Sequence, residues 1–437
     1  MKKILLLLTF ITLYSTSFSF DKSKLDSLFE ILEENDKSMG SLSIYKDGKE
    51  VYSNSLGYEH IENGAKTTNK TRYRIGSISK TFTATIIMKL VESKKLTLET
   101  TLSEFYPTVK NSENITIKQL LKHRSGIYNF TNDEEYTEWM EDPISKEDLV
   151  DVIAEYPSSF EPDSKAEYSN SNYVLLSFIA EDVLKKEFAT ILEELITKPC
   201  KLENTYYGAA IGNESNEAQS YTYIGEWEQA TETDMSVPMG AGAIVSTASD
   251  LNKFLYCLFN GKVVSEVSLK EMMNLEDRFG AGLFTVPYGN KTAYGHTGGI
   301  DGFQSNAFYF EDDKVSFTYL SNGVAIPLNN ILVGVLSIYF GDEYELPVFK
   351  PAIEVPTSEL EQYVGIYSTS AIPMKMNIFI EDGVLYGQGT GQPKFPLEAY
   401  EKHKFKFDQA FLKIEFRPDT SELVIVQGGG ELVMKKE

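Results

Sequence analysis

The sequence predicts an α/β fold in which helices flank an antiparallel sheet that carries a helical insertion, followed by a small all-β barrel. Three observations support this fold class. A stretch of helical periodicity near the N-terminal end leads directly into a hairpin pattern. Residues 116–202 are mostly helical in pattern, and the apolar residues beyond 357 alternate with a period of two.

The first expected elements are a helix and a hairpin. Residues 24–34 place apolar side chains at helical spacing. Residues 42–44 then alternate between apolar and polar, Asp47-Gly48 is a tight-turn signature, and Val51 begins the return strand. A helix that lies on antiparallel strands is a typical start for a layered α/β domain.

The strongest helical patterns follow. Residues 77–93 repeat apolar positions at helical spacing, but they include threonines, which are mediocre helix formers, so we expect burial to stabilise this helix. The insertion contains three further helical patterns, at 117–122, 146–155 and 171–185. Residues 245–259 predict another helix, with Ser249 or Asp250 as its N-cap.

Strand patterns return from Tyr294 onward. Residues 305–310 and 315–320 predict a second hairpin, and 332–340 can form a closing helix. Three prolines then mark a stiff linker, at Pro347, Pro351 and Pro356. The alternating segments behind it predict a small barrel. The chain therefore divides into residues 1–19, a main domain at 22–342, a linker at 343–356 and a barrel module at 357–437.

The first nineteen residues have the pattern of an export signal. Lys2 and Lys3 supply the positive charge, and 4–14 is an apolar stretch too short to span a bilayer. Ser17 and Ser19 place small residues where cleavage after Ser19 needs them. We therefore expect an exported protein, periplasmic or secreted, with no membrane attachment after cleavage.

The composition excludes several classes of partner. A formal net charge of −23 argues against nucleic acid and anionic membranes as partners, because phosphate binding needs a cationic surface. The four histidines are scattered, so we expect no metal, and we expect no cofactor. The glycines of Gly387–Gly391 have no helix after them, which favours a turn over a phosphate loop. Cys200 and Cys257 lie in apolar surroundings that favour two free core thiols over a disulfide.

The segment Gly76-Ser77-Ile78-Ser79-Lys80 carries an S-x-x-K motif. Residues three apart on a helix share a face, so Lys80 can place its amine beside the Ser77 hydroxyl. A serine hydroxyl becomes a nucleophile when a nearby base takes its proton, and burial lowers a lysine pKa toward that task. A helix N-terminus also offers partial positive charge to a developing oxyanion. On its own the motif is weak, since a capping serine and a solvated lysine give the same letters.

Two later motifs strengthen this interpretation. Tyr168-Ser169-Asn170 supplies a phenol for proton transfer and an amide that can hold the lysine and a substrate. His296-Thr297-Gly298-Gly299 is a candidate strand edge whose glycines allow a substrate to lie along the backbone. Each motif alone has a structural explanation, but the three occur in one order in a chain with an export signal. Together they predict acyl transfer. No G-x-S-x-G elbow or H-E-x-x-H motif offers a rival mechanism.

In these motifs the sequence resembles the serine β-lactamase and penicillin-binding-protein superfamily, and within it the class C β-lactamase and DD-carboxypeptidase branch. Three more segments carry the likeness, at 119–127, 240–251 and 320–323. The resemblance covers about residues 22–342 and implies the β-lactamase/transpeptidase-like fold. The tail, with Tyr363-Val364-Gly365-Ile366-Tyr367, resembles the lipocalin-like module appended to such enzymes.

The resemblance implies a mechanism and a set of roles. Ser77 would attack a carbonyl, Lys80 and Tyr168 would move protons, and Asn170 would orient the substrate. His296, Thr297, Gly298 and Gly299 would bind it, with the N–H groups of Ser77 and Gly299 forming the oxyanion hole. Many relatives have lysine at the His296 position, so recognition of a substrate carboxylate should here be weaker or pH-dependent.

The implied function is that of a serine hydrolase acting on small peptides, esters or β-lactams, with peptidoglycan fragments as possible substrates. A D-peptidase, carboxypeptidase-like or β-lactamase-related amide hydrolase is favoured. The alternatives are a carboxylesterase that uses the same site and a non-catalytic binder of cell-wall or peptide fragments. The substrate itself is not predicted, because specificity depends on the loops around the site.

Overall fold

A six-stranded antiparallel sheet forms the centre of the protein, in the order β10-β11-β12-β13-β1-β2. The computed structural model describes residues 20–212, 216–410, 412–427 and 430–437, so the predicted signal at 1–19 lies outside the described residues. The strands are β1 (Ser38–Lys46), β2 (Lys49–Leu56), β10 (Phe284–Tyr288), β11 (Lys291–Ile300), β12 (Phe303–Phe310) and β13 (Val315–Val324).

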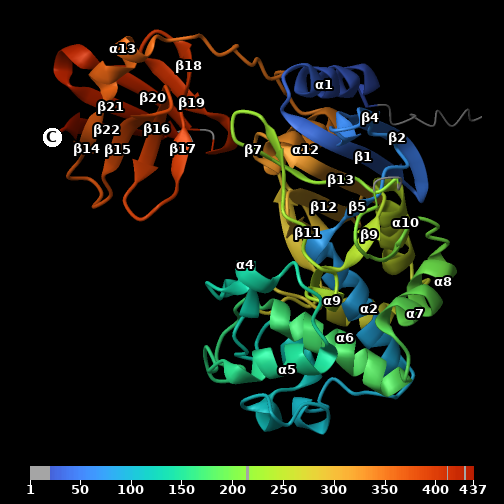
Figure 1. The fold of residues 1–437 in the computed structure, drawn as a ribbon. Coiled ribbons are helices and arrows are strands. Elements are labelled where there is room, and N and C mark those ends of the chain that lie inside the picture. Colours follow the sequence, from blue (N-terminus) through green and yellow to red (C-terminus); the bar gives the residue numbers. More distant parts are fainter. Residues whose placement is uncertain (1–19, 213–215, 411, 428–429) are drawn as a thin grey trace, which may run out of the picture.

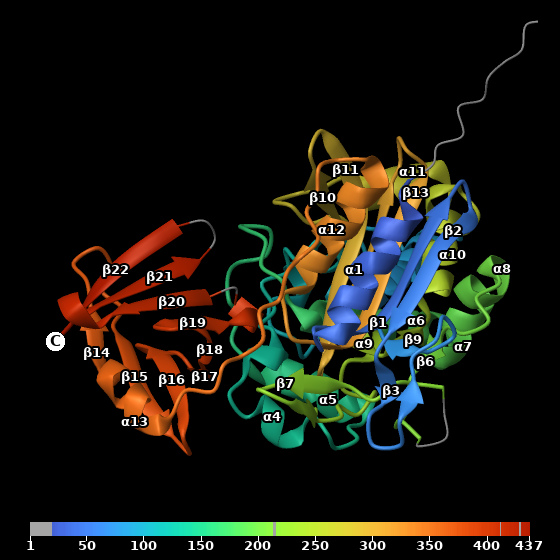
Figure 2. The ribbon, with the colours of Figure 1, turned by 90° about the horizontal axis from the view of Figure 1, so that it is seen from above.

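Helices cover both faces of this sheet (Figures 1 and 2). On one face lie α1 (Lys22–Glu34), which contacts β1 and β2, and α12 (Leu328–Phe340), which contacts α1. On the other face α10 (Ala248–Phe259) contacts β1, β12 and β13. The buried helix α2 (Ser79–Glu92) lies between this layer and the helical region. The predicted α/β class, with helices on an antiparallel sheet, is confirmed.

The helical insertion forms its own layer below the sheet in Figure 1. The helices of the insertion are α3 (Ile117–Leu121), α4 (Tyr136–Trp139), α5 (Lys146–Glu155), α6 (Asn170–Leu184), α7 (Phe188–Leu192) and α8 (Lys198–Cys200). Two helices from later in the chain join this layer, α9 (Met239–Gly242) and α11 (Glu266–Met273). Short strands connect the layers: β3 (Tyr58–His60), β4 (Ala65–Lys66), β5 (Tyr73–Arg74), β6 (Tyr206–Tyr207), β7 (Tyr221–Tyr223), β8 (Trp227–Gln229) and β9 (Ile244–Ser246).

Two boundaries differ from the sequence prediction. The stretch expected to begin a helix at 245 starts as strand β9, and the N-cap of α10 is Thr247, whose hydroxyl accepts from the Asp250 N–H at 3.2 Å. Ser249 and Asp250 therefore lie inside the helix. Strand β10 also precedes the expected start at Tyr294. Its half-buried side chains and Pro287 give no clear alternation, and an edge strand tolerates proline.

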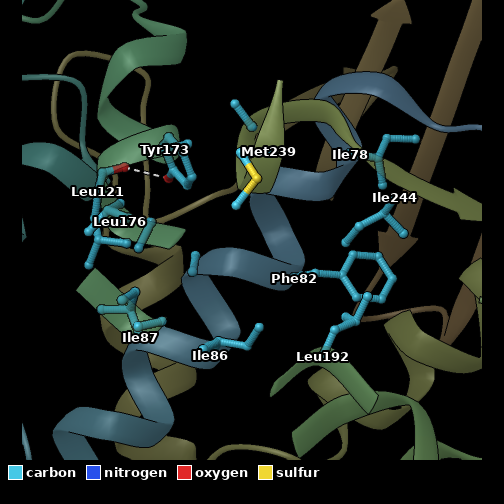
Figure 3. Packing of buried hydrophobic residues seen from close by; sticks show 14 of the residues in the cluster. Ile78, Phe82, Ile86, Ile87, Leu121, Tyr173, Leu176, Leu192, Met239 and Ile244 are labelled. Carbon is cyan, nitrogen blue, oxygen red and sulfur yellow. Dashed lines mark hydrogen bonds between the residues drawn. The ribbon is translucent and has the colours of Figure 1, made fainter. Parts of the chain in front are cut away.

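Helix α2 is stabilised by burial, as its threonine content predicts. Phe82 stacks on Phe254 of α10 with ring centroids 3.8 Å apart, and Figure 3 shows α2 surrounded by apolar side chains from several elements. The hydroxyls of Thr81, Thr83 and Thr85 are buried, and each donates to a carbonyl at 2.7 Å. Tertiary contacts therefore offset the weak helix propensity of this segment.

The C-terminal module is a nearly closed barrel of nine antiparallel strands with its own apolar core. A short helix, α13 (Thr357–Leu360), precedes it. The strands are β14 (Gly365–Ser368), β15 (Met376–Glu381), β16 (Val384–Gly389), β17 (Lys394–Pro396), β18 (Glu398–Glu401), β19 (Lys404–Phe407), β20 (Leu412–Arg417), β21 (Glu422–Gln427) and β22 (Gly430–Lys436). The glycine-rich segment predicted as a turn runs in β16 as far as Gly389.

The module contacts the main domain through its turn at Asp408–Ala410. Lys37, which is 6% exposed, forms an ion pair with Asp408 at 2.9 Å. The Gln409 side-chain amide donates to the backbone carbonyl of Tyr223. Within the described ranges no helix is long and apolar enough to cross a membrane. Cys200 and Cys257 are both buried and free.

The packing of α2 yields a stability prediction. Phe82→Ala removes a fully buried ring from the stack with Phe254, so we expect a loss of about 3–5 kcal/mol in the free energy of unfolding. Denaturant unfolding followed by circular dichroism measures it. Val267→Ala, at a position that is 79% exposed, is the control and should change stability by less than about 0.5 kcal/mol. Equal effects of the two substitutions would contradict the assignment of α2 to the core.

Candidate active site

Ser77 and Lys80 lie side by side at the head of α2. Ser77 is in the 3₁₀ turn Gly76–Ile78 that leads into the helix, and Lys80 is in the first turn of the helix itself. The Lys80 Nζ lies 3.0 Å from the Ser77 Oγ. It also lies 2.7 Å from the Asn170 Oδ1 and 2.8 Å from the Ala241 carbonyl oxygen. The amine is thus fixed by two carbonyl-type acceptors and directed at one hydroxyl.

Burial determines the charge of this amine. Lys80 has no solvent exposure, and desolvation lowers its pKa well below the ordinary value of a lysine. A neutral amine has two N–H donors and one lone pair. The two donors match the oxygens of Asn170 and Ala241, which leaves the lone pair for the Ser77 hydroxyl. The geometry is that of a general base next to its nucleophile.

Gly76 allows the nucleophile turn to approach strand β11. Its φ of +51° is unfavourable for other residues, and a Cβ at this position would lie 2.8–2.9 Å from the backbone of Gly299. The Ser305 hydroxyl donates to the Ile75 carbonyl at 2.9 Å, and this hydrogen bond stabilises the packing of the nucleophile turn against the sheet. The backbones of Ser77 and Gly299 therefore meet beside the Ser77 hydroxyl, although they are 222 residues apart in the sequence.

Tyr168 is held behind Ser77 by an aromatic cluster. Its ring stacks on His123 with centroids 4.5 Å apart, and the Lys80 Nζ lies 4.8 Å from the ring centroid. Burial raises the pKa of Tyr168, while a hydrogen bond with Ser77 acts in the opposite direction. The phenol is therefore favoured in its protonated form. With a neutral Lys80 beside it, this tyrosine is better suited to donate a proton than to accept one.

His123 is a site residue that sequence reasoning did not select. It is 3% exposed, and its Nδ1 accepts from the Ser169 N–H at 3.1 Å. Burial, followed by the nearby Lys80, lowers its pKa well below the ordinary value. His123 therefore supports the tyrosine as a neutral ring. Its position in the segment 119–127, which carries part of the family likeness, was the available signal.

Asn170 begins helix α6 and holds Lys80 in place. Its Oδ1 accepts from Lys80, its Nδ2 donates to the Thr131 hydroxyl at 2.9 Å, and its backbone N–H donates to the Asn129 Oδ1 at 2.8 Å. The predicted contact with the lysine is present. Asn170 also lines the cavity next to Ser77, where a substrate can reach it.

The motif His296-Thr297-Gly298-Gly299 lies in β11, as expected of a strand edge. Pairing of β10 with β11 runs from Lys291 to Gly295 and ends there. The remaining part of β11 turns its edge toward the Ser77 turn, with Thr297 and Gly299 exposed. An extended substrate can therefore pair with this edge next to the nucleophile.

His296 differs from the other three residues of the motif because its ring is buried. It is 5% exposed, and its centroid lies 4.7 Å from that of Phe284. Desolvation, followed by the nearby Lys80, lowers the His296 pKa to about 3. The ring is neutral near pH 7 and cannot attract a carboxylate as a cation. The sequence left open whether recognition of a substrate carboxylate is weaker or pH-dependent. Because His296 does not titrate near pH 6.5, its protonation cannot make this recognition pH-dependent.

A cavity of about 380 Å³ opens beside Ser77. Its walls include apolar and hydroxyl side chains from the insertion, the loop between β8 and α9 and the end of β11, among them Phe130, Thr131, Tyr136, Met140, Thr233 and Ile300. Asp301 is the one charged residue among the described residues that line it. The cavity therefore offers no cation to a substrate.

Asp301 belongs to a buried charge cluster around Arg74. The Arg74 guanidinium is 1% exposed and pairs with Asp301 at 3.1 Å and with Glu232 at 2.9 Å. Burial raises the pKa of the Asp301 carboxyl, and hydrogen bonds from Thr233 and Arg74 act in the opposite direction. Sequence reasoning missed Arg74, because its acidic partners are 158 and 227 residues away.

Comparison with known proteins places this geometry in a family. Residues 28–329 match the family model described as Beta-lactamase. The chain belongs to the β-lactamase family. It is 26% identical to penicillin-binding protein 4* of Bacillus subtilis over 431 residues, which cover 90% of this chain and 93% of that protein. It is also 26% identical to a teichoic acid D-alanine hydrolase of Staphylococcus aureus, over 63% of this chain and 68% of that protein.

Solved structures show the same fold. The D-amino acid amidase of Ochrobactrum anthropi SV3 matches with a TM-score of 0.67 and 23% identity, over 74% of this chain and 99% of that chain. The octameric penicillin-binding protein homologue of Pyrococcus abyssi also has a TM-score of 0.67 and 23% identity, and it covers 95% of this chain and 100% of that chain. The predicted superfamily and its serine hydrolase class are confirmed. The lipocalin-like origin of the barrel stays a prediction.

The base assignment gives a kinetic prediction. Lys80→Met removes the amine beside Ser77, and we expect the rate of Ser77 labelling by a fluorophosphonate probe to fall by about 10²–10⁴-fold, the usual contribution of a general base. Mass spectrometry locates the adduct and measures the rate. Lys89→Met, further along the same helix, is the control and should label at the rate of the unmodified protein. Normal labelling of the Lys80 variant would remove the lysine from the mechanism.

Buried His296 gives a prediction for stability against pH. The unfolded chain binds a proton on this histidine near pH 6.5, whereas the folded protein leaves it neutral down to about pH 3. The unfolded state therefore binds more protons in this window, so stability falls as the pH drops from 6.5 toward 3. His296→Gln should make that fall shallower than in the unmodified protein. Denaturant unfolding at pH 7.5, 5.5 and 4.5 tests this, and parallel curves for both proteins would contradict it.

Proposed function

We propose that this protein is an exported serine hydrolase that cleaves small D-aminoacyl amides and esters through an acyl-enzyme on Ser77. The observation that carries the proposal is the buried Lys80 amine, 3.0 Å from the Ser77 Oγ, beside a cavity lined by no basic side chain among the described residues. The first feature supports acyl transfer. The second supports a substrate that has no carboxylate next to the scissile bond.

The proton transfers follow from the protonation states that burial favours. Neutral Lys80 takes the proton of the Ser77 hydroxyl as Oγ attacks the carbonyl carbon. The backbone N–H groups of Ser77 and Gly299 stabilise the oxyanion, a contribution of about 2.7–4 kcal/mol per donor in a comparable site. Tyr168 gives its phenolic proton to the leaving group and regains one from Lys80. Water then attacks the acyl-enzyme by the reverse sequence.

Charge favours an amine on the acyl side of the substrate. The Arg74 guanidinium is buried and occupied by its partners, so it is not available to a carboxylate. Asp301 lines the cavity, and together with Glu232 it outnumbers Arg74, so the field of this cluster attracts an ammonium group and repels a carboxylate. A carboxypeptidase or a β-lactamase acts on substrates with a free carboxylate. This site therefore supports an amidase or esterase better.

The names of two relatives support a substrate whose amino acid has the D-configuration. One of them is named for hydrolysis of D-alanine from teichoic acid and another is titled a D-amino acid amidase. Both names describe a small D-aminoacyl group. A cavity of about 380 Å³ can hold such a group together with the nitrogen or oxygen atom of the scissile bond. Export rests on the signal pattern of residues 1–19 and would place the enzyme where such substrates occur. N-terminal sequencing of the protein recovered from culture medium or periplasm tests the export.

The substrate proposal is tested with D-alanine p-nitroanilide, its L-isomer and N-acetyl-D-alanine p-nitroanilide. We expect turnover of the first, with preference over both others. Asp301→Asn should reduce the preference for the free amine over the acetylated amine by about tenfold, because it removes a charge near the ammonium. Glu228→Gln, which neutralises an exposed acid on β8, is the control and should keep the preference. Faster turnover of the acetylated substrate by the unmodified enzyme would overturn the proposal.

A further inference from the structure

A short hairpin at Glu276–Phe279 packs against the aromatic cluster that holds Tyr168. It belongs to the connection between α11 and β10. The Glu276 N–H donates to the Phe279 carbonyl at 2.9 Å, and the Phe279 N–H donates to the Glu276 carbonyl at 3.0 Å. Two reciprocal hydrogen bonds around two central residues define a tight turn. The turn therefore fixes the backbone from which the Phe279 ring projects.

The two central residues of this turn have a strained backbone. Asp277 has a φ of +45° and Arg278 has a φ of +74°. Positive φ at both central positions is typical of a type I′ turn, which favours asparagine, aspartate and glycine. Arginine is unfavourable there, because its Cβ crowds the following carbonyl in the left-handed region. Such strain persists only where the surrounding structure holds the backbone, and it is concentrated at functional sites.

Ion pairs hold the hairpin to the residues on either side of His123. Glu276 pairs with Lys122, with 2.7 Å between Oε1 and Nζ, and Asp277 pairs with Arg124. Lys122 is 1% exposed, so its ammonium group depends on paired carboxylates for the solvation that it has lost. His123 itself has a φ of +57°. The hairpin therefore fixes the strained segment that carries the His123 ring.

Phe279 carries this constraint to His123 and through it to Tyr168. The Phe279 ring meets the His123 ring edge to face, with centroids 5.1 Å apart, and His123 stacks on Tyr168 at 4.5 Å. The centroids of Phe279 and Tyr168 are 6.2 Å apart. The three rings therefore pack together, and loss of the Phe279 ring would leave a gap into which His123 can move away from Tyr168.

We propose that Phe279 is a positioning residue for the proton donor Tyr168 and acts through His123. This rests on the proposed function, in which Tyr168 protonates the leaving group. As the bond from the acyl carbon to the leaving atom breaks, that atom takes the electron pair and the phenolic proton of Tyr168. Phe279 is not among the described residues that line the cavity beside Ser77, so its effect on the reaction is indirect.

Leaving groups differ in their need for this proton, which allows the role of Phe279 to be measured. An anilide nitrogen must be protonated as it leaves, whereas p-nitrophenolate departs as a stable anion. D-alanine p-nitroanilide and D-alanine p-nitrophenyl ester share the acyl group and have leaving groups of the same shape. For each, kcat/KM reports acylation, because hydrolysis of the common acyl-enzyme comes later. Tyr168→Phe should therefore lower kcat/KM for the anilide far more than for the ester.

Phe279→Ala should reproduce this selectivity. We expect kcat/KM for the anilide to fall by about 10²-fold, the cost of misplacing a reacting group by about 1 Å, with little change for the ester. Phe279→Leu, which retains more of the apolar packing, should show a smaller loss of the same selectivity. In a His123→Leu background, Phe279→Ala should cost nothing further. Phe395→Ala is the matched control, because this half-buried ring stacks on Phe407 in the barrel module, and it should leave both constants unchanged.

Equal losses on both substrates, or an unchanged anilide constant, would refute the positioning role, as would losses that add fully in the double variant. If the unmodified enzyme turns over neither substrate, the proposed function fails instead. NMR with labelled histidine then decides the role of Phe279, since the chain has only four histidines to assign. The nuclear Overhauser effect between the His123 and Tyr168 rings should weaken in the Phe279→Ala variant and persist in Phe395→Ala. An unchanged effect in Phe279→Ala would refute the proposal.

Discussion

The site depends on one buried contact, that between the Lys80 amine and the Ser77 hydroxyl. A lysine deprived of solvent loses the hydration that stabilises its charge, so the neutral form becomes accessible. Asn170 and Ala241 supply acceptors for both of its N–H groups without adding a negative charge that would restore the ammonium form. The contact therefore makes a base out of a residue that is ordinarily an acid.

The surrounding fold preserves this arrangement. Helix α2 is covered by α10, the insertion and α9. The hydroxyls of its threonines donate hydrogen bonds to backbone carbonyls of neighbouring elements or of the helix itself. Gly76 allows the nucleophile turn to contact β11, and His123 supports Tyr168 from behind. The elements that exclude water from Lys80 are thus the same ones that place the nucleophile beside the strand edge. One packing arrangement therefore determines both the stability of helix α2 and the pKa of Lys80.

Charge distinguishes this site from what the family pattern alone suggests. The first residue of the strand motif is His296, and burial keeps its ring neutral. Arg74, whose partner Asp301 lines the cavity, is enclosed by Asp301 and Glu232. The histidine itself is visible in the motif, but the burial that keeps its ring neutral and the enclosure of Arg74 are effects of the tertiary structure. The barrel module contacts the catalytic domain through Gln409, whose side-chain amide donates to the Tyr223 carbonyl.

The sequence by itself determined the fold class, the helix at 146–155, the hairpin turn at Asp47-Gly48 and the grouping of Ser77, Lys80, Tyr168 and Asn170. The helix and the turn are local patterns whose physics is contained in neighbouring residues, whereas the grouping of Ser77 and Lys80 with Asn170, 90 residues from Lys80, followed from the family resemblance. Strand β10, the N-cap Thr247, the Arg74 cluster and the role of His123 were decided by the tertiary structure. Their partners lie far away in the chain, and the charge of a buried group depends on solvent exclusion, which only the assembled fold establishes.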